Sequence, residues 1–164
     1  MNYHYWVNKL ELLPHPEGGF YKETYRSVEM IPEDTLQGFH SARNICTAIY
    51  FLMSSGKISA FHRILSDELW FFHSGSSLLI HQLDNKIGLQ THRLGLDFEK
   101  GDRPQITIPA YSWFGSEVED YDSFSLVSCT VAPGFDFMDF EMGDREKLVK
   151  EYPKHQAVIE RLTY

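Results

Sequence analysis

The sequence predicts an all-β fold, an antiparallel sandwich or barrel with short helices at its N- and C-terminal ends. Between residues 45 and 131, short apolar runs recur at close intervals, and Gly, Pro, Asn, Asp and Ser turns separate them. This pattern is typical of antiparallel β proteins, and no helical period interrupts it. At 164 residues, the chain has the length of one domain with a single core.

The order of the expected elements follows from these runs. We expect strands at residues 47–53, 59–64, 68–73, 77–83, 89–94, 104–108, 112–116 and 124–131, and one more at 135–141, where aromatic and acidic residues alternate. Near the N-terminus, Trp6, Leu10 and Leu13 recur at helical spacing and predict a short helix, which Pro14 ends.

The expected domain divides into four parts. An N-terminal helix and arm occupy about residues 1–27, the barrel about 45–141 and C-terminal helices about 144–163. The loop at about 28–44 has no period of either kind, and we predict that it forms a lid over the barrel mouth.

Charge and composition exclude several function classes. The formal net charge of −8 and the pI near 5.4 disfavour phosphate-rich surfaces, so we expect neither nucleic acid nor a membrane as a partner. The longest uncharged apolar stretch, residues 45–55, is far shorter than the roughly 20 residues of a membrane helix. The N-terminus has no signal-peptide pattern, which predicts a cytoplasmic protein. In that compartment Cys46 and Cys129, each in an apolar run, are expected to be small core residues.

Residues 56–75 contain the pattern in which we expect the chemistry. Two glycines bracket two short strands, and side-chain alternation places His62 and Glu68 on the same side. We expect these two side chains to converge inside the barrel as a coupled pair, with an imidazole that titrates near neutral pH.

The spacing Gly-x5-His-x5-Glu-x6-Gly in this stretch resembles the first motif of the cupin superfamily, and residues 101–114 resemble the second. In metal-dependent cupins the two motifs supply the metal ligands, and the resemblance implies that Ile64 and Phe114 occupy two of the four ligand positions here. Neither side chain has a lone pair to donate. We therefore expect no metal and no other cofactor.

A narrower resemblance covers essentially the whole chain. Its motifs are, in order, His-Pro-Glu-Gly-Gly-Phe-Tyr at 15–21, Thr-Ala-Ile-Tyr-Phe-Leu at 47–52, Ser-Asp-Glu-Leu-Trp at 66–70 and Val-Ala-Pro-Gly-Phe-Asp-Phe at 131–137. These motifs look like those of the cupin 5 family, also called DUF985. The resemblance implies a double-stranded β-helix, the jelly roll or cupin barrel, that pairs as a homodimer and has no firmly assigned reaction.

Three functions fit these observations. The first is a metal-independent isomerase or epimerase for a sugar or sugar nucleotide, in which His62 removes a proton beside a carbonyl and Glu68 orients the imidazole. The second is a non-catalytic binding protein or sensor for a small metabolite, sugar-like or an organic acid. The third is a metal-dependent cupin whose incomplete ligand set is completed by His73 or water.

The remaining expected site residues would bind this small-molecule ligand: Tyr21, Arg43, Tyr50, Trp70, Phe72, Arg103, Gln105, Tyr111 and Phe114. One of the three tyrosines would return the proton, the aromatic side chains would stack on the ligand, and the two arginines would bind a carboxylate or phosphate.

The segment before the barrel leaves its roles open. Glu17 fits a pocket and a dimer interface equally well, and His15 is assigned to the surface or an interface. Alternation in the following strand would place Tyr21, Glu23 and Tyr25 on one side.

Overall fold

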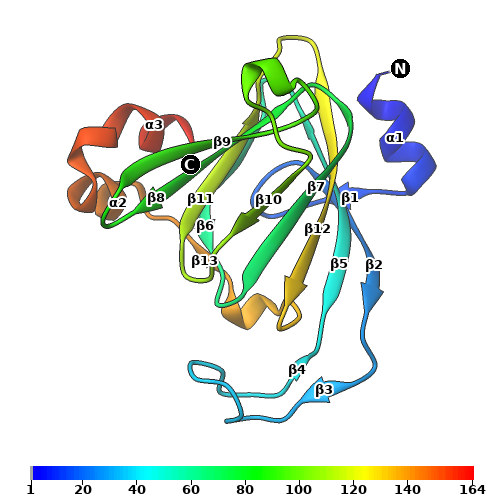
Figure 1. The fold of residues 1–164 in the computed structure, drawn as a ribbon, viewed down its shortest axis with the longest axis vertical. Helices are drawn as coiled ribbons and strands as arrows, with labels where there is room; N and C mark the ends of the chain where they lie inside the picture. Colours follow the sequence, from blue (N-terminus) through cyan, green and yellow to red (C-terminus); the bar gives the residue numbers. More distant parts are fainter. Residues whose placement is uncertain (1) are drawn as a thin grey trace.

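Two antiparallel sheets face each other in the computed structural model, which describes residues 2–164 (Figure 1). In sheet order, the six-stranded sheet contains β1 (Leu13–Pro14), β2 (Phe20–Arg26), β5 (Thr47–Ser54), β12 (Phe124–Ala132), β7 (Asp67–Gly75) and β10 (Gln105–Ile108). The five-stranded sheet contains β13 (Glu141–Met142), β6 (Ile58–Arg63), β11 (Trp113–Val118), β8 (Leu78–Asp84) and β9 (Gly88–Leu94). A separate hairpin pairs β3 (Met30–Ile31) with β4 (Arg43–Asn44). The all-β prediction is confirmed.

Short helices cover the outer faces of both sheets. Helix α1 (Tyr3–Leu10) begins at Asn2, whose side chain accepts a hydrogen bond from the Tyr5 backbone N–H. Helices α2 (Arg145–Glu151) and α3 (Gln156–Arg161) lie at the other end of the chain, beside the five-stranded sheet (Figure 1). The 3-10 turns are η1 (Phe98–Lys100), η2 (Phe137–Asp139) and η3 (Pro153–His155). Among residues 2–164, no helix is long and apolar enough to cross a membrane.

Apolar side chains from both sheets meet between them. Phe51 and Trp70 come from the six-stranded sheet and Phe114 from the five-stranded sheet, and each is at most 1% exposed. Two smaller clusters lie on the outer faces, one beneath α1 around Leu52 and one beneath α2 and α3 around Phe61. Burial of this apolar surface holds the two sheets together.

Three segments differ from the sequence prediction. Helix α1 ends at Leu10, and Leu13, which was expected in the helix, lies with Pro14 in strand β1. Residues 135–141 do not form one strand, because Asp136 caps the 3-10 turn η2 and pairing resumes only at β13. Residues 28–44 form the β3–β4 hairpin and its turn, which extend away from the sandwich at the lower end of Figure 1. A sequence in which aromatic and acidic residues alternate can therefore form a turn as well as a strand, when its side chains contact different parts of the protein.

Candidate functional site

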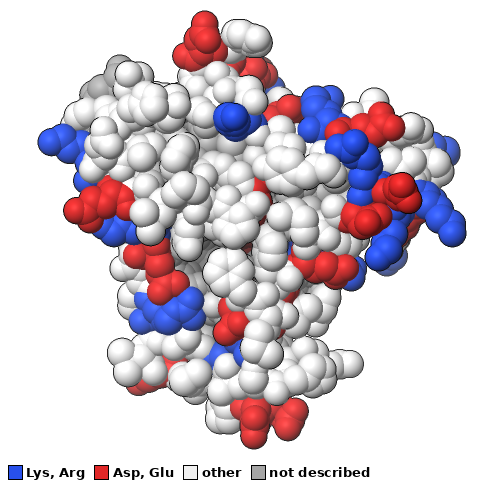
Figure 2. All heavy atoms as spheres, turned by 180° about the vertical axis from the view of Figure 1, so that it is seen from behind, with Lys and Arg blue, Asp and Glu red and all other residues white. Residues whose placement is uncertain are grey.

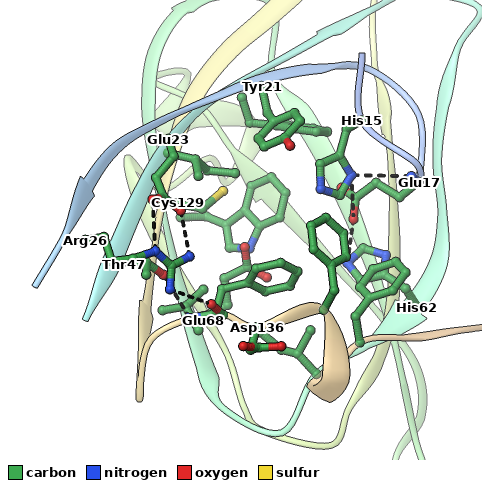
Figure 3. A pocket seen from close by; sticks show the side chains of 18 residues that line it. His15, Glu17, Tyr21, Glu23, Arg26, Thr47, His62, Glu68, Cys129 and Asp136 are labelled. Atoms are coloured by element: carbon green, nitrogen blue, oxygen red, sulfur yellow. Dashed lines mark hydrogen bonds and ion pairs between the residues drawn. The ribbon is translucent and has the colours of Figure 1, made fainter. Parts of the chain in front are cut away.

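A cavity of about 470 Å³ opens at one end of the space between the sheets (Figure 3). Strands β2, β5, β7 and β12 of one sheet and β6 of the other contribute side chains to its wall, together with the β1–β2 loop and residues 135–140. Most of the wall is apolar or aromatic, and a few polar groups point into it. This combination is typical of small-molecule sites.

The β1–β2 loop crosses from the six-stranded sheet to the five-stranded sheet and carries Glu17 to His62. Gly18 permits this crossing, because it has a φ of +112° and a Cβ atom there would lie 1.9 Å from the Ile58 carbonyl oxygen of β6. The Glu17 carbonyl then accepts a hydrogen bond of 2.8 Å from the Ala60 backbone N–H. The two glycines of the His-Pro-Glu-Gly-Gly motif thus place an acidic side chain deep inside the sandwich.

Inside the cavity, the Oε2 atom of Glu17 lies 3.1 Å from Nε2 of His62 (Figure 3). The other imidazole nitrogen, Nδ1, is 2.8 Å from the Ala60 carbonyl oxygen and donates its hydrogen to it. Nε2 of a neutral His62 is then unprotonated and accepts from Glu17. Ser59 Oγ donates to the second carboxyl oxygen of Glu17 at 2.9 Å.

Burial keeps this pair neutral. The pKa of Glu17 is raised chiefly by burial, and the pKa of His62 is lowered to about 4, again chiefly by burial. His15, whose Nδ1 is 3.6 Å from Glu17 Oε2, also has a lowered pKa with burial as the main cause. Both shifts favour a neutral pair in which one proton lies between the Glu17 carboxyl and the His62 imidazole.

Glu68 stands on the facing wall. It comes from β7 of the six-stranded sheet and is 7% exposed. Within the described chain, no hydrogen bond or ion pair to its carboxyl group meets ordinary geometric limits. Burial raises the pKa of Glu68 to about 8, with an added contribution from the negative charge of Glu17 whenever that group is ionised, although the Cys129 thiol and the Trp70 indole N–H lie close enough to lower it somewhat. Glu68 is thus a neutral carboxylic acid at pH 7.

At the edge of the cavity, a β-bulge turns Arg26 inward. The register of β2 against β5 shifts between Glu23 and Tyr25, so that Tyr25 is 54% exposed and Arg26 lines the cavity instead. Arg26 donates to both carboxyl oxygens of Glu23, at 2.9 and 2.7 Å. Simple alternation misplaces Tyr25 because it has no means to detect the bulge.

Residues 135–140 close another part of the cavity. Phe140 stacks on His62 with ring centroids 5.3 Å apart, and Phe137 stacks on His15 at 6.3 Å. Arg43 holds this segment by donating to both carboxyl oxygens of Asp139 at 2.6 Å, in an ion pair whose side chains are each 6% exposed. The predicted lid, residues 28–44, contributes none of the lining residues. Residues 28–44 instead contribute Arg43, which anchors the cavity-lining segment 135–140.

The structure separates the predicted site residues into two groups. His62, Glu68, Tyr21 and Trp70 line the cavity. The remaining predicted side chains do not line it: Arg43, Tyr50, Phe72, Arg103, Gln105, Tyr111 and Phe114. Of these, Phe114 packs directly against the site, because its ring centroid is 4.2 Å from that of His62.

The expected pair of His62 and Glu68 is not formed. Side-chain parity predicts correctly that both point inward, but β6 and β7 belong to different sheets, so the residues stand on facing walls. The partner of His62 is Glu17, and the further cavity residues His15, Glu23, Arg26 and Asp136 were also not predicted as a group. A glutamate beside a Gly-Gly turn was the one available signal, and it did not distinguish an interface from a pocket.

The residues at the cupin ligand positions do not fit a metal ion. Ile64 and Phe114 have no donor atom, and His73 faces Ser128 Oγ at 2.9 Å without lining the cavity. Across residues 2–164, no group of three or more His, Cys, Asp and Glu side chains is arranged to hold a metal.

Comparison with known proteins gives a consistent result. The model of the family described as cupin superfamily (DUF985) matches residues 4–143. A solved structure of a Shewanella oneidensis protein is 41% identical with a TM-score of 0.88, covering 100% of this chain and 98% of its own. A hypothetical protein from Leishmania major is 34% identical with a TM-score of 0.91, covering 100% and 99%. An uncharacterised protein of Saccharomyces cerevisiae is 30% identical over 145 residues, which are 81% of this chain and 71% of that protein.

Proposed function

We propose that this chain, which belongs to the DUF985 family of the cupin superfamily, is a small-molecule enzyme of the isomerase or epimerase type. The fold of the family alone does not define a reaction, so the proposal depends on the site. The reaction proposed is proton transfer beside a carbonyl group of a sugar-type ligand, without a metal. The observation that carries this proposal is the placement of two proton-holding groups, the Glu17–His62 pair and Glu68, on facing walls of one cavity.

The proton-holding groups on the two facing walls have different roles in the proposed reaction. The Glu17–His62 pair shares one proton and accepts a second one as an imidazolium beside a neutral carboxyl group. When the C–H bond beside the carbonyl group breaks, its two electrons form a C=C bond and the π electrons of the carbonyl group move to the oxygen. The proton goes to the Glu17–His62 pair. Glu68, as a neutral acid, donates a hydrogen bond to that oxygen and stabilises the developing charge. Return of this proton to the former carbonyl carbon, with the neighbouring hydroxyl proton passing to the former carbonyl oxygen, gives the isomer. Protonation of the original carbon on its opposite face, with the oxygen returning to a carbonyl, gives the epimer.

The rest of the wall supports ligand binding. The rings of Tyr21, Phe51 and Trp70 line the cavity and present flat apolar faces of the kind on which sugar rings pack. Apolar surroundings also strengthen the hydrogen bonds made by the two proton-holding groups.

Proton exchange with solvent tests this function even when the product is unidentified. The protein is incubated in D2O with a panel of aldoses, ketoses and their derivatives, and deuterium at the carbon beside the carbonyl is followed by mass spectrometry and proton NMR. We expect incorporation with at least one compound, and its loss in His62→Gln and in Glu68→Met, which removes the hydrogen-bond donor. His4→Gln and Glu99→Met, at exposed positions, are the matched controls and should retain it. Incorporation that persists in His62→Gln would assign the chemistry elsewhere.

A second candidate function is non-catalytic binding of the same ligand. It is favoured by one observation: Nε2 of His62 is already engaged by Glu17, which leaves the imidazole without a free lone pair in the unliganded protein. This candidate predicts saturable ligand binding with no deuterium incorporation in any compound that binds.

We also propose that the protein forms a homodimer. Apolar side chains on and around the outer strands of the six-stranded sheet remain exposed, among them Leu13 at 65%, Tyr25 at 54% and Val28 at 95%. Beyond Tyr21, strand β2 has no partner on its outer side in the described structure, because β1 pairs only with Phe20 and Tyr21. Light scattering at micromolar concentration should give twice the monomer mass, and a Tyr25→Asp or Val28→Asp substitution should reduce it.

A further inference from the structure

The charged groups around the cavity carry information about its ligand. Figure 2 shows that most Lys and Arg atoms on one face of the molecule lie beside Asp and Glu atoms, while a few stand apart from them. Among the residues that line the cavity, Arg26 is the only basic side chain other than histidine, and the four carboxyl groups are those of Glu17, Glu23, Glu68 and Asp136.

Arg26 is not free to bind an anion. Four of the five N–H donors of its guanidinium group are used, two by the carboxyl group of Glu23, one by Asn44 Oδ1 at 2.8 Å and one by the Phe135 carbonyl at 3.1 Å. The two histidines do not replace it, because burial lowers the pKa of both His15 and His62 and leaves them uncharged at neutral pH. A phosphate or carboxylate inside this cavity would therefore lack a counter-ion, and burying an unpaired charge is costly.

Glu68 is a buried polar group that faces the cavity. Its side chain lines the cavity and is more than nine-tenths buried, and the Cys129 thiol and the Trp70 indole N–H lie near its carboxyl group without an ordinary hydrogen-bond geometry; among residues 2–164 no other hydrogen bond or ion pair to this group is formed. Buried polar groups in proteins nearly always have a partner. We infer that the partner is the ligand: the cavity selects an uncharged molecule with a carbonyl or hydroxyl oxygen, to which the Glu68 carboxyl group donates a hydrogen bond, and excludes the phosphorylated, nucleotide-linked or carboxylated forms of the same molecule.

This inference rests on the proposed function for the location of the ligand, and it narrows the substrate class to free sugars and similar neutral carbonyl compounds. Sugar nucleotides and organic acids, which the sequence left open, are excluded by it. The same protonated carboxyl group would polarise the carbonyl group next to the C–H bond that breaks.

The protonation of Glu68 depends on every titratable group packed around it. These groups are His15 and Glu17 from the β1–β2 loop, Tyr21, Glu23 and Arg26 from β2, His62 from β6, Cys129 from β12 and Asp136 next to η2. Burial favours the protonated form of Glu68, and ionisation of Glu17 would favour it further, whereas Arg26 is neutralised by Glu23. Because the pKa of Glu68 is about 8, the hydrogen-bond donor is present at pH 7 and is lost above pH 8.

Binding measurements test the inference independently of turnover. Titration calorimetry and saturation-transfer NMR at pH 7 compare matched probes: dihydroxyacetone with its phosphate, glucose with glucose 6-phosphate and glucuronate, and fructose with fructose 6-phosphate. We expect the uncharged member of at least one set to bind at least about tenfold more tightly than its charged counterparts. Tighter binding of a phosphate or carboxylate, or no binding of any uncharged probe, would overturn the inference.

The pH dependence and two variants locate the donor. For the uncharged probe that binds, affinity should be constant from pH 6 to 7 and about tenfold weaker at pH 9, one unit above the pKa of Glu68. Glu68→Gln keeps an N–H donor of the same shape, so it should bind with no pH dependence, whereas Glu68→Met should not bind. Undiminished affinity in Glu68→Met would refute the role of Glu68. Deuterium exchange failing while this binding pattern holds would refute the proposed reaction alone.

Discussion

Nε2 of His62 and Oε2 of Glu17 lie 3.1 Å apart inside the sandwich, although 45 residues of sequence separate them. The contact exists because the β1–β2 loop crosses between the sheets at Gly18. Its chemical consequence is a neutral, proton-sharing pair in the wall of a cavity, opposite a second neutral acid.

A double-mutant cycle should detect this pair. Removing either partner leaves a buried polar group unpaired, so His62→Gln and Glu17→Gln should each lower the free energy of unfolding by about 1–3 kcal/mol. Urea denaturation at pH 7 of both single variants and the double variant should give a coupling energy of at least about 1 kcal/mol. The matched cycle of His62 with Glu68, which face each other across the cavity without a contact, should give a coupling close to zero. The reverse order of the two couplings would contradict the geometry.

The pH dependence of stability should report Glu68. Its folded-state pKa of about 8 exceeds its unfolded value near 4.5, so the folded state holds the extra proton between these values. The contribution of Glu68 to stability is therefore full below about pH 4.5 and is lost as pH rises toward 8, by about 5 kcal/mol in total.

Glu68→Gln removes this dependence. The variant's unfolding free energy, relative to that of the wild type, should rise steadily between pH 5 and 8 and level off above pH 8.5. Glu99→Gln, an exposed carboxyl group, serves as the control and should show no such slope. A Glu68→Gln difference that is independent of pH would mean that Glu68 ionises normally in the folded protein.

The sequence predicted the strands well and the site only in part. Residues such as Phe51 and Cys129 lie in regular, paired stretches of strand, where alternation and turn signals determine which side chains point inward. The same rule placed His62 and Glu68 inside but had no information on which sheet each strand joins. Glu17 was ambiguous because its partner is distant in sequence. Arg26 entered the cavity through a bulge, which one residue of extra length creates without a clear sequence signal.

The buried ion pair of Arg43 and Asp139 should hold residues 135–140 over the cavity. Arg43→Met leaves the buried Asp139 carboxylate without its partner, and Asp139→Asn leaves the buried Arg43 guanidinium without a counter-ion. Each substitution should lower the free energy of unfolding by about 3–5 kcal/mol. Hydrogen exchange at the backbone of residues 135–140 should accelerate in both variants. Arg63→Met, which breaks the more exposed pair with Glu141, is the control and should cost at most about 1 kcal/mol. Unchanged exchange at 135–140 in the Arg43 variant would show that the segment is held by other contacts.

Restoring the absent donors should create a metal site. The resemblance to the cupin motifs assigns Ile64 and Phe114, together with His62 and Glu68, to the four ligand positions of metal-dependent cupins. We expect untagged wild-type protein to contain less than stoichiometric zinc, manganese, nickel or iron by elemental analysis. The Ile64→His/Phe114→His variant should bind Co²⁺ with visible d–d absorption and release protons, because Glu68 must ionise to become a ligand. Stoichiometric metal in wild-type protein that is lost in His62→Gln would overturn the metal-free assignment.

The protonation states of the two walls can be measured together by NMR titration between pH 4 and 9.5. Imidazole ¹⁵N shifts report His62, carboxyl ¹³C shifts report Glu68, and spectra of His62→Gln and Glu68→Gln assign the signals. We expect His62 to stay neutral, with its hydrogen on Nδ1, down to about pH 4, and Glu68 to lose its proton near pH 8. A His62 signal of imidazolium form at pH 6, together with a Glu68 carboxylate already formed at pH 6, would contradict it.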